Sequence, residues 1–82
     1  MRNKSQYQVQ FPPTVKKVIE LFDYNREDYN LVDESNCINL TALEDFLIDE
    51  YYVVYGSDEH KAIEDVCIKA QAKLLKRGDF NE

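Results

Sequence analysis

The side chains best suited to recognising another molecule are three glutamines near the start of the chain. They alternate with three apolar residues, in the order Gln6, Tyr7, Gln8, Val9, Gln10 and Phe11. A period of two places one set on each face of a β-strand. The glutamine amide carries a donor and an acceptor on one planar group, so it can bond adenine N6 and N7 bidentately. A glutamine row is also ordinary on a solvated strand face, and both interpretations stand at this point.

Positive charge is concentrated beside this stretch. The 82-residue chain has a net charge of −6, yet residues 1–19 carry four basic residues and no acidic one. Residues 20–65 carry fourteen acidic and two basic residues. A local basic patch attracts phosphate even when the whole protein is acidic. The basic residues beside the glutamines, each equally consistent with a plain surface position, are Arg2, Lys4, Lys16 and Lys17.

Catalytic and metal sites find little support in the sequence. His60 is the only histidine, and Cys37 and Cys67 lie far apart, so the roughly four ligands of a zinc site are missing. We expect both cysteines to be buried thiols. The chain has no glycine-rich loop or nucleophile motif, and the adjacent acids at 49–50 and 64–65 point to different helix faces. We therefore predict that the protein is not an enzyme and binds no metal or cofactor.

Length and composition predict a single domain over residues 1–82. A chain this small buries only about 60–65% of its unfolded surface, so dimerisation would relieve a marginal stability. The sequence has no apolar run of the roughly 18–20 residues that a membrane span needs. Its first residues do not resemble a signal peptide. We expect a cytoplasmic protein with no membrane partner.

The first half of the chain is predicted to hold one strand and one helix. The strand covers residues 5–11, and Pro12 and Pro13 end it because proline cannot donate to a β-ladder. A helix follows over residues 13–24, with Thr14 as a capping residue. Its apolar residues recur with helical spacing at Val15, Val18, Ile19 and Phe22. Residues 25–40 form a loop, because turn formers dominate this stretch.

The second half is predicted to hold two helices. Thr41 and Glu44 form a capping box that starts a helix over residues 41–55, and Gly56 ends it. This helix is apolar on two sides, so we expect it to be central to the fold. The last helix covers residues 58–77, begins after Ser57 and ends at Gly78. The tail beyond Gly78 is expected to fray.

This order of elements is similar to that of the ribbon-helix-helix family of DNA-binding proteins. Residues 6–12, Gln-Tyr-Gln-Val-Gln-Phe-Pro, resemble the strand and following proline of Arc-type phage repressors. Residues 38–51 resemble the second helix of CopG-type plasmid repressors, from its capping residue to the aromatic residue near its end. Two features depart from the family: the helices are joined by about fifteen residues without glycine, and the outward strand positions carry no Arg or Lys.

The resemblance implies a mostly α-helical fold, with one N-terminal strand paired across a homodimer and an extra C-terminal helix. The paired strands would enter the major groove of double-stranded DNA. Three groups of residues then receive roles. The base contacts would be Gln6, Gln8 and Gln10. The phosphate contacts would be Arg2, Lys4, Lys16, Lys17, Asn39 and Thr41. The dimer core would contain Tyr7, Val9, Phe11, Phe46, Leu47 and Tyr51.

Two functions are therefore compatible with the sequence. The first is a homodimeric transcriptional regulator, most simply a repressor from a phage or plasmid, that recognises a DNA operator. The second is a protein-interaction module, such as an antitoxin or a small acidic inhibitor of a host protein. Its contact surface would be the helix at 58–77 or the loop at 25–37. The acidic middle of the chain and the two-sided helix at 41–55 motivate this alternative.

Overall fold

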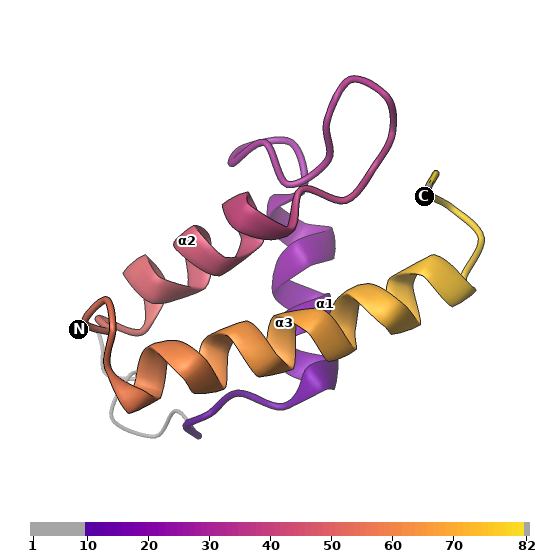
Figure 1. Ribbon diagram of the computed structural model, residues 1–82. Helices are drawn as coiled ribbons and strands as arrows, with labels where there is room; N and C mark the ends of the chain where they lie inside the picture. Colours follow the sequence, from indigo (N-terminus) through magenta and orange to yellow (C-terminus); the bar gives the residue numbers. More distant parts are fainter. Residues whose placement is uncertain (1–9, 82) are drawn as a thin grey trace.

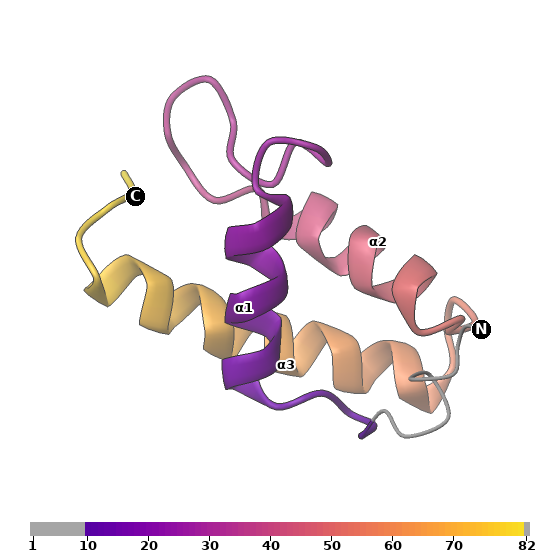
Figure 2. The ribbon, with the colours of Figure 1, turned by 180° about the vertical axis from the view of Figure 1, so that it is seen from behind.

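The computed structural model describes residues 10–81, which form three α-helices around one core. Helix α1 covers Val15–Asn25, α2 covers Leu40–Glu50 and α3 covers Asp58–Lys76. The long helix α3 packs against both shorter helices; α1 crosses it and α2 lies beside its first half (Figures 1 and 2). Residues 10–81 contain no strand, only isolated β-bridges. The mostly helical class with three helices is confirmed.

The predicted strand at residues 5–11 lies mostly outside the described residues, which begin at Gln10. Gln10 and Phe11 belong to no strand. The Phe11 ring instead packs edge-on against Tyr51, with 5.9 Å between the ring centroids. Phe11 therefore has an apolar contact within its own chain. The strand pairing and the homodimer stay predictions.

Helix α1 begins close to the predicted position. Thr14 is its N-cap, and its hydroxyl oxygen accepts a hydrogen bond of 3.0 Å from the Lys17 amide. Pro13 lies before the cap rather than inside the helix. Val18 and Phe22, from the predicted apolar stripe, are fully buried. The 3.6-residue periodicity thus identified the side of α1 that faces the core.

Helix α2 starts earlier and ends sooner than predicted. Its N-cap is Asn39, whose side-chain oxygen accepts from the Ala42 amide at 3.2 Å, so the predicted capping role of Thr41 is wrong. The helix ends at Glu50 rather than at residue 55. The Val53 amide donates to the Ile48 carbonyl at 3.0 Å and the Tyr52 amide to the Asp49 carbonyl at 3.4 Å. These two bonds form a Schellman motif with a tyrosine, not the predicted glycine, at its left-handed position.

Helix α3 matches its prediction closely and supplies the surface on which the other elements pack. Ser57 caps it by accepting from the His60 amide at 3.2 Å, and Gly78 follows its end in a left-handed conformation. The buried side chains along α3 are Ile63, Val66, Cys67, Ala70 and Leu74. On the exposed side of α3, Asp65 and Lys69, four residues apart, form an ion pair at 3.1 Å.

The segment between α1 and α2 is an ordered loop anchored in the core. Leu31 and Ile38 are buried, and Val32 and Ile38 form an antiparallel bridge. Between them, one carboxylate oxygen of Asp33 accepts from the amides of Ser35 at 2.9 Å and Cys37 at 3.0 Å. The Asp33 side chain therefore holds the tip of the loop in place.

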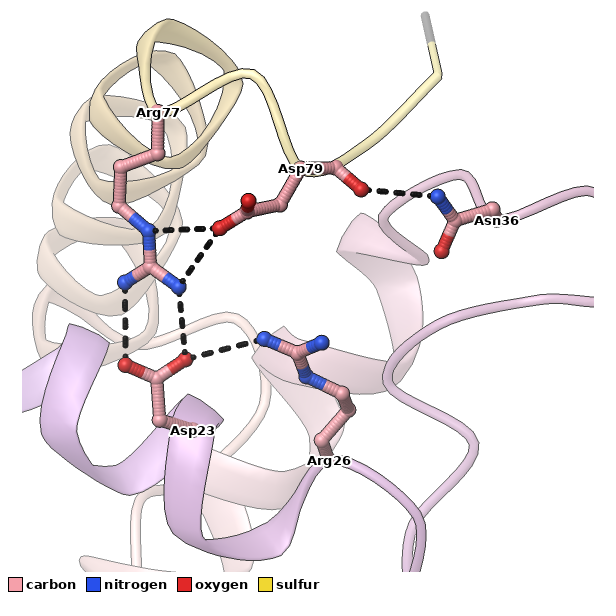
Figure 3. A network of polar contacts seen from close by, with 5 residues as sticks. All are labelled: Asp23, Arg26, Asn36, Arg77 and Asp79. Atoms are coloured by element: carbon pink, nitrogen blue, oxygen red, sulfur yellow. Dashed lines mark hydrogen bonds and ion pairs between the residues drawn. The ribbon is translucent and has the colours of Figure 1, made fainter.

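The described residues of the tail after α3, 79–81, lie against the core instead of fraying, and the Phe80 ring is buried. The ring packs edge-on against Phe22 with 5.6 Å between centroids, and the Arg26 guanidinium lies 4.8 Å from its centre. A polar network ties the end of α3 and the tail to α1 and the loop (Figure 3): Arg77 pairs with Asp23 at 3.0 Å, and the Asn36 amide donates to the Asp79 carbonyl at 2.8 Å. The hydrogen bond from Arg77 is the main cause of a lowered pKa at Asp23.

The docked tail predicts that Phe80→Ala lowers the free energy of unfolding by about 3 kcal/mol, as expected for loss of a buried aromatic ring. The measurement is urea denaturation followed by circular dichroism. Tyr24→Ala is the matched control, because Tyr24 is 87% exposed and a surface substitution changes stability by less than about 0.5 kcal/mol. Equal, small effects in both variants would mean that the tail adds nothing to the core.

Candidate functional site

The outer side of α2 carries a shallow groove with an aromatic floor and acidic walls. It has a volume of about 310 Å³ and is lined by Tyr29, Ala42, Asp45, Phe46, Asp49 and Glu50. Five of these residues follow one another along α2 with helical spacing, so they share one face. Tyr29 comes from the turn after α1, and its ring centroid lies 4.6 Å from that of Phe46. We call this surface the acidic groove.

The carboxylates of the acidic groove lie where the helix disfavours them. Asp45 and Asp49 are four residues apart, so their like charges repel. Asp49 and Glu50 lie in the last turn of α2, at the negative end of the helix dipole, and no basic residue accompanies them there. Among residues 10–81, no basic side chain forms an ion pair with these three carboxylates. By contrast, Asp23 in the last turn of α1 pairs with Arg26 and Arg77.

A cluster of exposed apolar side chains lies directly beside the acidic groove. Tyr52, Val54 and Tyr55 are 81%, 72% and 64% exposed, and we call them the apolar turn. The Tyr55 hydroxyl donates a hydrogen bond of 2.9 Å to Asp45, a wall of the groove. This bond is the main cause of a raised pKa at Tyr55. The apolar turn therefore adjoins the acidic groove through Tyr55.

The apolar turn is held by hydrogen bonds to the start of α3. The Gly56 amide donates to His60 Nδ1 at 2.9 Å, and the Ser57 hydroxyl donates to the Val54 carbonyl at 2.6 Å. The Tyr55 ring packs edge-on against the His60 ring. Because Nδ1 of His60 accepts a bond, the proton of the neutral ring sits on Nε2, which lies 3.3 Å from Glu64. The side chains of the apolar turn are therefore carried by a backbone that hydrogen bonds hold in place.

Those residues predicted to contact DNA that the structure describes lie in two separate places on the chain. Lys16 and Lys17 are exposed in the first turn of α1, and Gln10 is exposed in the segment that precedes the helix. Asn39 and Thr41 lie at the start of α2, next to the opposite end of α1 (Figures 1 and 2). The side-chain oxygen of Asn39 is occupied by the helix cap. Four predicted contact residues lie outside the described residues: Arg2, Lys4, Gln6 and Gln8.

The residues predicted to form the dimer core are partly used within the chain. Phe46 and Leu47 are buried in the core of this chain, and Tyr51 is half-buried against Phe11. Tyr7 and Val9 lie outside the described residues. A dimer that used Phe46 and Leu47 would therefore have to replace contacts that the single chain already makes.

Burial raises the pKa of ionisable side chains away from the acidic groove, Cys67 and Glu44 among them. Cys67 is fully buried, and burial raises the pKa of its thiol to about 12, which keeps it protonated and unreactive. Burial, with the nearby Glu64 as the next cause, raises the pKa of Glu44. Cys37 is half-buried, and both cysteines are free. In residues 10–81 no three His, Cys, Asp or Glu side chains are grouped to hold a metal ion.

No protein-family model, curated protein or solved structure matches the chain. Across the part of the chain described here, no helix is both long and apolar enough to cross a membrane. The surface of the acidic groove and apolar turn was not found by sequence reasoning. Its one signal was the second apolar side of the helix predicted at 41–55, which includes Tyr52 and Tyr55.

The misplaced charges of α2 predict that Asp49→Asn raises the free energy of unfolding by about 0.5 kcal/mol, because it removes a like-charge repulsion and an anion at the negative helix end. Urea denaturation at low and high salt is the measurement. Glu34→Gln is the control, since Glu34 is exposed in the loop. The gain should shrink at high salt. A loss of stability, or an equal gain in the control, would contradict the electrostatic account.

Proposed function

We propose that this protein is a protein-interaction module that holds a partner protein against the acidic groove and the apolar turn. The observation that carries the proposal is the apolar turn itself. Three large apolar side chains are exposed within four residues of a hydrogen-bonded segment, and one of them, Tyr55, bonds to Asp45 of the groove. Clustered exposed apolar residues with a polar rim are typical of protein-binding sites, and tyrosine is enriched there.

The backbone at Tyr52 supports a role beyond stability. Tyr52 has φ +56°, in the left-handed region. This conformation costs an L-residue about 1–2 kcal/mol, and Asn tolerates it better. Among residues 10–81, the other two non-glycine residues in this region are Asn30 and Asn36. Tyr52 is therefore the exception, and its side chain is too exposed for core packing to explain the choice.

The proposal predicts that a photo-crosslinking amino acid at position 52 captures one partner protein in the native cell. The same amino acid at position 24 is the matched control, because Tyr24 is also strongly exposed but lies on α1, outside the apolar turn. The specific product at position 52 should disappear when Val54→Ser and Tyr55→Ser are added. The proposal fails if positions 24 and 52 give the same products or if position 52 gives none.

A second candidate is a homodimeric, sequence-specific regulator that binds double-stranded DNA through a β-ribbon. The observation that favours it is the exposure of Gln10, just before α1, and of Lys16 and Lys17 in its first turn. The two lysines occupy the first turn of α1, at the positive end of the helix dipole, where they do not stabilise the helix. Phosphate contact would account for that placement, because neutralised phosphates supply much of the affinity for DNA.

This second candidate predicts binding to DNA from upstream of the protein's own gene in preference to a scrambled duplex. A titration at about 50 and 200 mM salt separates base recognition from phosphate attraction, because only the latter falls steeply with salt. Gln8→Ala with Gln10→Ala should remove the preference. A preference that survives this double substitution would contradict base contact by the glutamines, and no binding at either salt would eliminate the candidate.

A further inference from the structure

The acidic groove has the chemistry of a site for a cation with a flat face. Its floor is the tilted pair of Tyr29 and Phe46, and Tyr29 is half exposed. Its walls include the exposed carboxylates of Asp45 and Asp49, on successive turns of α2. An aromatic face attracts a cation within about 6 Å, and carboxylates attract it from the side. The combination is more specific than a cluster of acids alone.

The charge of the groove is uncompensated within the described part of the chain. Asp45 accepts a hydrogen bond from the Tyr55 hydroxyl, which is neutral, and Asp49 and Glu50 have no ion-pair partner among residues 10–81. Asp49 and Glu50 lie at the negative end of α2. A bound cation would relieve both the repulsion among the three acids and the unfavourable interaction of Asp49 and Glu50 with the helix dipole. The occupant that complements this surface is therefore positively charged.

Arginine fits the groove better than lysine. Its planar guanidinium can stack on an aromatic ring and bond carboxylates through a fixed fork of donors, whereas the lysine ammonium is a compact, strongly hydrated charge. The same fold already contains this arrangement. Arg26 lies 5.5 Å from the centre of the Phe22 ring and pairs with Asp23 at 3.3 Å.

We propose that the acidic groove binds an arginine side chain of the partner protein, with the guanidinium against Tyr29 and hydrogen-bonded to Asp45 and Asp49. This inference rests on the proposed protein-binding function and names the chemistry of the partner: a basic segment that presents arginine beside an apolar residue. The arginine occupies the groove, and the apolar residue packs on the adjoining apolar turn.

The test is an NMR titration of the full-length, ¹⁵N-labelled protein with the probe acetyl-Arg-Arg-amide. Saturable shifts should be confined to the amides of Tyr29 and residues 42–50. The same dipeptide built from citrulline has nearly the same shape without the charge and should shift these amides at least fivefold less. The lysine dipeptide should bind more weakly than the arginine one. Diffuse shifts, or equal binding of the citrulline probe, would overturn the proposal.

Two double variants distinguish binding by the groove carboxylates from attraction by the net charge of the protein. Asp45→Asn with Asp49→Asn should weaken the arginine probe at least fivefold. Glu20→Gln with Glu34→Gln removes the same net charge at exposed positions outside the groove and should change affinity less than twofold. An equal loss in both pairs would mean that net charge alone attracts the probe. The folded state of each variant is checked in its own spectrum before titration.

Two further outcomes are distinguishable. If groove amides shift with protein concentration before any probe is added, the occupant is a second copy of this chain, and the assignment to a partner is wrong. Because the titration needs no partner, its result is independent of crosslinking at position 52. A specific crosslink without arginine binding would overturn only the proposal that the groove binds arginine. Arginine binding without a crosslink would overturn the proposed protein-binding function, and the groove would remain a site for a guanidinium group.

Discussion

The fold depends on the burial of one apolar stripe along α3. This 19-residue helix contacts α1 on one part of its length and α2 on another, whereas α1 and α2 have only 11 residues each. Ile63, Cys67 and Leu74 are fully buried under these neighbours. A small domain has little apolar area to spare, so each element has to reach this common surface. Leu31 from the loop and Phe80 from the tail belong to the same buried core, and Phe80 packs there against Phe22 of α1.

The use of α2 in this core determines what remains outside. Leu43, Leu47 and Ile48 fill the inner side of α2, and the helix stops at Glu50. Had it continued to residue 55, Tyr52 and Tyr55 would have extended a second apolar stripe along it. The Schellman motif turns the chain instead, and Val53 packs against the core while Tyr52 and Val54 point out. The termination of α2 therefore creates the apolar turn beside the acidic groove.

Helical periodicity was enough to locate the three helices and their buried faces, because apolar spacing reports directly on the side that must leave water. Periodicity failed where the course of the backbone depends on a single side chain. The end of α2 was misplaced because glycine is the usual left-handed residue, and here Tyr52 takes that conformation. The docked tail was missed because a single aromatic, Phe80, has no period. The acidic groove could not be foreseen, because Tyr29 reaches α2 from a separate turn and only the folded chain brings it to Phe46.

The residues that break the usual preferences for helix ends and backbone conformation are concentrated in a few places. Helix α3 follows the rules throughout: Ser57 caps it, acids occupy its first turn, and Lys73 and Lys76 occupy its last. Helix α2 ends in uncompensated acids followed by a left-handed tyrosine, and all of these lie at the candidate docking surface. Helix α1 begins with two lysines at its positive end, at the candidate DNA surface. Natural sequences tend to break local consistency at functional sites. This distribution favours a purely structural role for α3. The candidate protein-binding surface lies at the end of α2, and the candidate DNA-binding surface lies at the start of α1.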